Sequence, residues 1–153
     1  MKPIRNSAKA IIIQDGRLLA MKGQGCEGTF YLLPGGGQER GETLHEALRR
    51  ECLEEANAEV VIGELRFIRE YIGRNHEFAT QDGEVHQVEF IFLCRLVKGC
   101  EVRMGSCPDN NQLGAEWLDL EHIERYRLYP CALGPLLRAL PSQGVPIYLG
   151  DVN

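Results

Sequence analysis

Hydrophobic positions follow two different spacings along the chain. Leu44, Ala47 and Leu48 stand at i, i+3 and i+4, which is the apolar stripe of a helix, and they predict one over residues 43–56. Runs rich in β-branched and aromatic residues predict strands instead. The predicted strands cover residues 8–14, 17–22, 29–33, 60–71, 85–97 and 115–118.

The segments between these elements carry turn signals. Asp15-Gly16 separates the first two strands and predicts a hairpin. Residues 73–83 read as a polar loop, Asp119 as the start of a short helix, and residues 130–140 as a final helix before a tail. No internal repeat or linker divides the chain. We therefore expect one α+β domain over residues 1–153, with strands surrounding two main helices.

The helix at residues 43–56 changes character along its apolar stripe. Seven residues are close to two helical turns, so Glu51, Glu54 and Glu55 continue the stripe that begins at Leu44. Buried carboxylates without partners are very costly, and a hard divalent cation with oxygen ligands neutralises them most simply. The alternative is a solvated acidic face, in which Arg50 pairs with a glutamate four residues away.

A glycine-rich turn precedes this helix and favours the metal-site interpretation. Gly35-Gly36-Gly37 lets backbone groups approach a ligand closely, a short loop away from the carboxylates. The whole segment resembles the signature box of the Nudix hydrolases. The positions at the family spacing are Gly36, Glu42, Arg50, Glu51, Glu54 and Glu55, whereas Asn57 replaces a family glycine and Cys52 and Ala58 replace larger aliphatic residues.

The resemblance implies a Nudix-type α/β/α sandwich with a mixed β-sheet. It also implies a metal-dependent hydrolase that cleaves the pyrophosphate linkage of a nucleoside diphosphate derivative, with Mg²⁺ as cofactor and Mn²⁺ as a substitute. The expected metal ligands are Glu51, Glu54, Glu55 and the main-chain carbonyl of Gly36, and Arg50 would orient the acidic cluster. Each ordinary alternative stays open at this point, such as a plain helix salt bridge for Arg50.

A general base is harder to assign from the residues. Glu89 alternates in phase with Ile91 on a strand that reads as buried, where a carboxylate needs a partner or a metal. A structural ion pair explains this position as well as catalysis does. Glu116 is the second candidate and a box glutamate the third, and the loop before Glu116 also offers Asp109. The candidate catalytic residues are Glu54, Glu51, Arg50 and Glu89.

Two further features have weaker interpretations. Glu42 is either a support for the glycine loop or a carboxylate favoured by the positive end of the helix dipole. Residues 23–28 match GxGxxG, but the strand-like Thr29-Phe30-Tyr31 follows where a dinucleotide fold needs a helix, so we expect a flexible loop and no Rossmann domain. Candidate phosphate contacts are Arg66, Arg69 and Arg74, candidate substrate contacts are His76 and His86, and candidate stacking or core aromatics are Tyr71, Phe78 and Trp117.

Composition narrows the possible partners. The chain has 153 residues, 44% hydrophobic and 25% charged, and a net charge of −5 argues against binding to duplex nucleic acid. No run approaches the ~18 apolar residues of a membrane helix, and the first residues lack a signal-peptide core. Six cysteines without a CxxC pair indicate reduced thiols and a cytoplasmic location. The expected substrate is a small nucleotide, and a homodimer is one expected assembly.

The sequence leaves the substrate and two other functions open. A nucleotide sugar such as ADP-ribose and a nucleoside triphosphate are both compatible with the resemblance. A nucleotide-sensing module that has lost catalysis is one alternative, against which the intact Glu51, Glu54 and Glu55 argue. A pyrophosphohydrolase acting on RNA 5′ ends is the other, against which the acidic charge balance argues.

Overall fold

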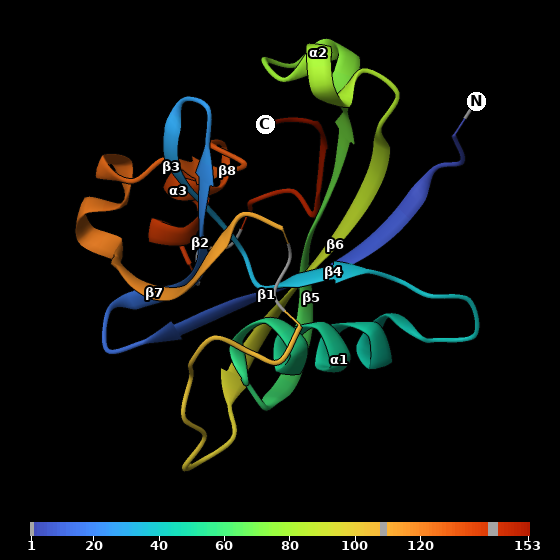
Figure 1. The fold of residues 1–153 in the computed structure, drawn as a ribbon. Helices are drawn as coiled ribbons and strands as arrows, with labels where there is room; N and C mark the ends of the chain where they lie inside the picture. Colours follow the sequence, from blue (N-terminus) through green and yellow to red (C-terminus); the bar gives the residue numbers. More distant parts are fainter. Residues whose placement is uncertain (1, 108–109, 141–143) are drawn as a thin grey trace.

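The computed structural model describes residues 2–107, 110–140 and 144–153 (Figure 1). In this part of the chain nine strands join into one mixed, curled sheet. The strands are β1 (Arg5–Gln14), β2 (Arg17–Gly25), β3 (Gly28–Leu32), β4 (Gly35–Gly37), β5 (Val60–Ile72), β6 (His86–Leu96), β7 (Gln112–Asp119), β8 (Leu128–Tyr129) and β9 (Tyr148–Asp151). The helices are α1 (Leu44–Ala56), α2 (Ala79–Asp82) and α3 (Leu133–Arg138), with 3₁₀ turns η1 (Gly73–Asn75) and η2 (Leu120–Arg125).

Strand β1 belongs to both halves of the sheet. It pairs parallel with β6 and antiparallel with β4, and its last residues pair antiparallel with β2. One half of the sheet therefore runs β4-β1-β6-β5-β9, and the other half runs β7-β2-β3-β8. The strand pairs include parallel and antiparallel examples, which confirms the predicted mixed sheet.

Two hydrophobic clusters lie on opposite faces of β1. Ala8, Ala10 and Ile12 point to the cluster that contains Leu48 of α1, whereas Ile11 points to the cluster that contains residues of η2 and α3. Successive side chains of a strand alternate between faces, so a single apolar strand can serve both clusters. Helices therefore cover both faces of the sheet, and the predicted α+β sandwich is confirmed.

Helix α1 begins and ends at capping residues. The Oγ1 of Thr43 accepts a hydrogen bond from the Glu46 amide at 3.2 Å, and the Glu46 carboxylate accepts one from the Thr43 amide at 2.7 Å. This reciprocal capping box satisfies two amides that the helix itself leaves free. At the other end, Asn57 adopts a left-handed conformation with φ 52°. The predicted helix over residues 43–56 is confirmed, with residue 43 as its cap.

Three predictions made between the long elements are wrong. Residues 23–28 form the end of β2, a two-residue turn and the start of β3, because Gly23 pairs with Phe30 across the hairpin. The glycine turn at 35–37 is extended enough to pair with β1 as strand β4. The polar loop at 73–83 contains η1 and α2. In the first two cases a partner strand supplies the hydrogen bonds that the local sequence does not indicate.

The end of the chain is also more structured than the sequence indicates. The final helix is shorter than predicted, since α3 covers only Leu133–Arg138 of residues 130–140. Strands β8 and β9, which no strand pattern predicts, pair parallel with β3 and β5 respectively. Among the described helices, none combines the length and apolar content that crossing a lipid bilayer requires. The extent of the domain over residues 1–153 stays a prediction.

We expect Thr43→Ala to destabilise the protein by about 1 kcal/mol, because it removes the capping hydrogen bond to the Glu46 amide. Urea unfolding at neutral pH measures the change. Thr43→Ser is the matched control, since serine keeps the accepting hydroxyl and should retain most of the stability. Equal losses for the alanine and serine variants would contradict the capping role.

Candidate functional site

The glycine strand β4 lies directly against the acidic part of α1. A Cβ atom placed on Gly36 would stand 2.5 Å from the carboxylate of Glu51, a distance that real side chains do not tolerate. The Gly36 carbonyl accepts a hydrogen bond from Ser7 Oγ at 3.0 Å, which ties β4 to β1. Glycine at this position therefore lets the Glu51 carboxylate approach the main chain of β4 closely.

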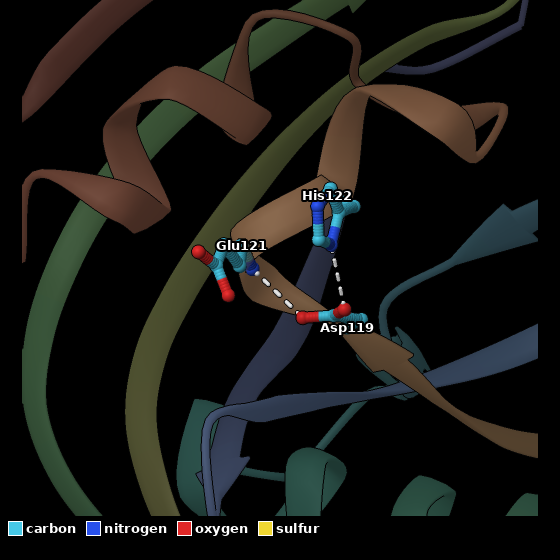
Figure 2. A group of neighbouring side chains, drawn as sticks. All are labelled: Asp119, Glu121 and His122. Atoms are coloured by element: carbon cyan, nitrogen blue, oxygen red, sulfur yellow. Dashed lines mark hydrogen bonds and ion pairs between the residues drawn. The ribbon is translucent and has the colours of Figure 1, made fainter.

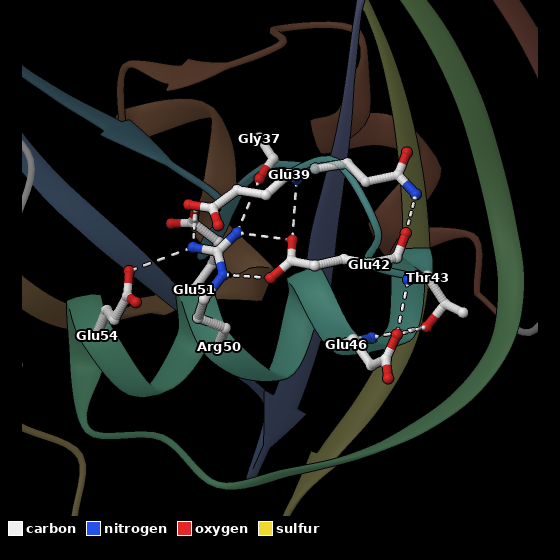
Figure 3. A network of polar contacts seen from close by, with 9 residues as sticks. Gly37, Glu39, Glu42, Thr43, Glu46, Arg50, Glu51 and Glu54 are labelled. Carbon is white, nitrogen blue, oxygen red and sulfur yellow. Dashed lines mark hydrogen bonds and ion pairs between the residues drawn. The ribbon is translucent and has the colours of Figure 1, made fainter.

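Arg50 joins the glutamates of the box into one network (Figure 3). Its Nη1 donates to Glu51 at 2.9 Å and to Glu54 at 3.3 Å, and its Nε donates to Glu42 at 2.6 Å. Its Nη2 donates to the Gly37 carbonyl at 3.0 Å, so the same guanidinium also holds the glycine strand. The predicted orienting contact between Arg50 and the acidic cluster is present. Its role in catalysis stays a prediction.

Glu42 has a structural place in this network. Hydrogen bonds from Arg50 and from the Glu39 amide lower the pKa of its carboxyl to about 2. The residue comes before the Thr43 cap, so its carboxylate binds Arg50 two turns further along the helix. Of the two interpretations from the sequence, support of the loop matches these contacts better than an interaction with the helix end alone.

Glu55 of α1 is buried against the glycine strand, with 2% of its surface exposed. Its two carboxylate oxygens accept hydrogen bonds from the Gly35 amide and from Gln112 Nε2, both at 3.1 Å. A residue outside the helix also holds the C-terminal end of α1, because the Gly105 amide donates to the Glu55 main-chain carbonyl at 2.7 Å. A Cβ on Gly105 would lie 1.9 Å from the Glu54 carbonyl oxygen, so this close approach again requires glycine.

The donor atoms at this site match the preferences of a hard divalent cation. Glu51, Glu54, Glu55 and the Gly36 carbonyl offer only oxygen, which Mg²⁺ and Mn²⁺ favour. Glu51 and Glu54 already share one positive group, the Nη1 of Arg50. The residues present therefore fit the implied metal, although the three carboxylates do not lie within 4.8 Å of one another.

A second group of donors lies far along the chain from this helix (Figure 2). In the described residues, Asp119, Glu121 and His122 are the one group of three donor residues whose ligand atoms lie within 4.8 Å of one another. Asp119 already accepts hydrogen bonds from the Glu121 amide at 3.0 Å and from His122 Nδ1 at 2.8 Å. This arrangement is the N-terminal cap of η2, and its contacts explain it without a metal.

Glu89 is buried in an ion pair. Its Oε2 accepts from Arg69 Nε at 2.6 Å and its Oε1 accepts from Gln87 Nε2 at 2.9 Å. Burial opposes the charge of this carboxylate, but the attraction of Arg69 and Lys9 outweighs burial and lowers its pKa. These contacts match the structural alternative considered from the sequence.

The other candidates for a general base stand apart from the box. Glu116 contacts the Tyr31 hydroxyl at 3.2 Å and Lys22 Nζ at 3.4 Å, on the β2–β3 side of the sheet. Asp109 lies outside the described residues. The glutamates of α1 are thus the carboxylates that the structure places beside the glycine strand.

A cavity of about 730 Å³ opens at the far end of β5 and β6 from α1. The β2–β3 hairpin, α2 and the ends of β5 and β6 all contribute to its lining. Arg69 lines the cavity and pairs with Glu89, which stands beside Ser7 of β1, itself opposite Gly37 of β4. Arg69 in the cavity wall therefore lies three strand spacings from Gly37, about 14 Å. Gln87 of β6 and Leu32 of β3 line the cavity nearer to the glycine strand.

The remaining candidates divide between this cavity and the rest of the fold. Tyr71 and Phe78 line the cavity, whereas Trp117 packs against the cluster beneath α1. His76 pairs with Asp151 at 2.5 Å, and His86 pairs with Glu70 at 2.6 Å. Arg66 lies over the ring of Phe67, and Arg74 lies in η1.

Sequence reasoning missed two residues that support the glycine strand. Lys9 Nζ donates to the Gly35 carbonyl at 2.8 Å, and Ser7 Oγ donates to the Gly36 carbonyl. A signal was available, because Lys9 interrupts the apolar strand 8–14 and Ser7, two residues earlier, falls on the same face of an extended chain.

A family profile described as NUDIX domain matches residues 3–139. A sequence comparison with curated proteins finds no match. The chain is similar to a MutT NUDIX hydrolase from Burkholderia pseudomallei, with 25% identity, a TM-score of 0.60 and coverage of 78% of this chain and 86% of that one.

Two further solved structures share the fold at lower identity. One is an ADP-ribose pyrophosphatase from Streptococcus suis, with 21% identity, a TM-score of 0.63 and coverage of 97% of this chain and 100% of that one. The other is a UDP-X diphosphatase, with 18% identity, a TM-score of 0.71 and coverage of 99% of this chain and 68% of that one.

The low pKa of Glu42 predicts a pH-dependent contribution to stability. Because the folded state lowers this pKa from 4.5 to about 2, the stabilisation is complete above pH 4.5 and is lost as the pH falls towards 2. We expect Glu42→Gln to lower the urea midpoint at pH 7, and the difference from the parent protein to shrink between pH 4.5 and 2. A difference that stays constant over this range would show that the charge of Glu42 is not what matters.

Proposed function

The chain belongs to the NUDIX family, and on that premise we propose that it hydrolyses the pyrophosphate linkage of a nucleoside diphosphate derivative with a divalent metal ion. As a Nudix pyrophosphohydrolase it acts on acid anhydrides of phosphorus. Beyond this family activity, we propose a bound metal, its ligands and a substrate. We propose Mg²⁺ as the cofactor, with Mn²⁺ as a substitute.

One contact carries the proposal. The carboxylate of Glu51 lies where a side chain on Gly36 would have to stand, so the carboxylate approaches the main chain of the glycine strand closely. Glu54 is held near Glu51, because Nη1 of Arg50 donates hydrogen bonds to both carboxylates. A purely structural helix face has no need of a glycine that admits an acidic side chain.

We propose that Gly36, Glu51, Glu54 and Glu55 hold the metal. When bound there, a divalent ion neutralises phosphate oxygens and acidifies water, which offsets the repulsion between an anionic phosphate and its nucleophile. Arg50 keeps two of these carboxylates oriented through its hydrogen bonds, and Glu42 in turn orients Arg50.

Glu54 is our choice as acceptor of the proton from the attacking water. Its side chain is 36% exposed against 15% for Glu51, so solvent reaches it more easily. Glu89, the leading candidate from the sequence, has both oxygens engaged and a lowered pKa, which makes it a weaker base. For Glu89 we therefore propose a positioning role, through Arg69.

The substrate that we propose is a nucleotide sugar. Two proteins of similar fold are named as an ADP-ribose pyrophosphatase and a UDP-X diphosphatase, which supports this choice over a nucleoside triphosphate. The cytoplasmic location and the homodimer stay predictions. All six cysteines are free thiols in the structure, which supports a reducing compartment.

We expect Glu54→Gln to lower turnover by about a hundredfold or more while leaving the fold intact. The measurement is release of products from a panel of nucleoside diphosphate derivatives and nucleoside triphosphates in Mg²⁺ or Mn²⁺, identified by mass. Glu59→Gln is the matched control, because Glu59 is an exposed glutamate just beyond α1. Unchanged turnover in Glu54→Gln would refute the assignment.

The same panel separates the alternatives. If the parent protein turns over none of the compounds yet binds nucleotides, a sensing module replaces the enzyme as the better interpretation. Preferential release from triphosphorylated or capped RNA, with a steep dependence on salt, would favour action on RNA 5′ ends.

A further inference from the structure

Residues 73–85 form one wall of the cavity of about 730 Å³. This wall segment connects β5 to β6 and contains η1 and α2. Six of its residues line the cavity: Glu77, Phe78, Thr80, Gln81, Asp82 and Val85. Strand β9, red in Figure 1, pairs parallel with β5 and leads up to the wall segment.

Asp151 of β9 binds three groups at the start of the wall segment. Its Oδ1 accepts a hydrogen bond from the Ile72 amide at 2.9 Å and contacts His76 Nε2 at 2.5 Å. Its Oδ2 accepts a hydrogen bond from Asn75 Nδ2 at 2.8 Å. Burial raises the pKa of this carboxyl, but the hydrogen bonds outweigh burial and lower the pKa to about 2. The carboxylate is therefore charged at neutral pH, with both of its oxygens engaged.

His76 links Asp151 to the cavity surface. Its ring stacks on that of Tyr71, with centroids 5.3 Å apart and planes 11° from parallel. The Tyr71 hydroxyl donates a hydrogen bond to Asp82 Oδ2 of α2 at 2.9 Å, and Tyr71 and Asp82 both line the cavity. A continuous series of contacts therefore runs from β9 to the cavity.

Helix α2 depends on these contacts for its position. It has four residues, none of them buried, and no side chain caps its first turn. A helix this short is not stable by itself in water. It packs directly on η1, because a Cβ on Gly73 would lie 1.9 Å from the main-chain oxygen of Asp82. The place of α2 therefore follows from that of η1, which Asp151 holds.

Strand β9 is itself fixed to the sheet by further side chains. The Tyr148 hydroxyl donates to Glu70 Oε1 at 2.7 Å, and Glu70 Oε2 pairs with His86, the first residue of β6, at 2.6 Å. The Val152 carbonyl accepts a hydrogen bond from Arg69 Nη1 at 2.6 Å. Asp151 thus acts from a strand that is held to both β5 and β6, one on each side of the wall segment.

We propose that Asp151 is a positioning residue for substrate binding, because it fixes the wall segment in the arrangement that completes the cavity. This rests on the proposed function, with part of the nucleotide substrate in the cavity. When the contact is lost, the wall segment populates other arrangements, and the apparent affinity falls with the fraction that stays competent. Saturating substrate restores the competent arrangement, so KM rises while kcat is retained.

Steady-state kinetics test this role, with ADP-ribose in Mg²⁺ or the panel compound that the parent protein turns over fastest. We expect Asp151→Ala to raise KM about tenfold and to leave kcat within about twofold. Asp151→Asn keeps an oxygen for the Ile72 amide and should raise KM less. His76→Phe keeps an aromatic ring over Tyr71 but loses the contact with Asp151, so it should also raise KM.

Asp119→Ala is the matched control. Asp119 accepts hydrogen bonds from the Glu121 amide and from His122 at the start of η2, much as Asp151 does at η1. Neither Asp119 nor His122 lines the cavity. Asp119→Ala should therefore destabilise the protein towards urea while leaving KM unchanged. Equal rises in KM for the two alanine variants would reduce Asp151 to a general stabilising residue and overturn its positioning role.

Hydrogen exchange provides a readout that needs no turnover. In Asp151→Ala the amides of residues 73–85 should exchange about tenfold faster than in the parent protein, whereas those of α1 should not change. If Asp151→Ala does not fold, Asp151→Asn and His76→Phe decide by the same measurements.

Two further outcomes separate this inference from the proposed function. An unchanged KM in a folded Asp151→Ala overturns the positioning role, whatever the exchange shows. A parent protein that turns over no compound refutes the proposed function. Faster exchange at residues 73–85 then still supports the hold of Asp151 on the wall segment, and unchanged exchange overturns it.

Discussion

The contact between the Arg50 guanidinium and three glutamates is the interaction on which the site depends. Glu42, Glu51 and Glu54 would repel one another if they were brought together alone. Arg50 offsets this repulsion, since its Nε donates to Glu42 and its Nη1 donates to both Glu51 and Glu54. The same side chain also donates to the Gly37 carbonyl, so the position of the glycine strand and the orientation of the carboxylates are coupled. A lysine would carry the charge but not the geometry.

The rest of the fold can be understood as the support of this contact. The capping box at Thr43 begins α1 at a defined residue, and the amides of Gly105 and Cys107 bind carbonyls of its last turn. On the other side, Ser7 and Lys9 of β1 hold the carbonyls of β4. Helix α1 is therefore held at both ends, and strand β4, which it faces, is held by β1. Small substitutions in either element would separate Glu51 from Gly36.

Charge is distributed unevenly between the acidic part of α1 and the cavity of about 730 Å³. Near α1, Glu51 and Glu54 gather around Arg50, and we propose that they recruit a metal there. In the cavity, Arg69 and Arg127 are neutralised by their own carboxylate partners, and aromatic rings provide much of the wall.

The sequence by itself determined the features that depend on spacing within one segment. The helix and the acidic stripe at Glu51, Glu54 and Glu55 follow from the 3.6-residue period, and the hairpin at Asp15-Gly16 follows from its turn residues. Only the tertiary structure decided the partners of Glu89 and Asp151 and the strand pairing of Gly36. These contacts join residues on different strands, and the register between strands depends on how the whole sheet packs rather than on any local pattern.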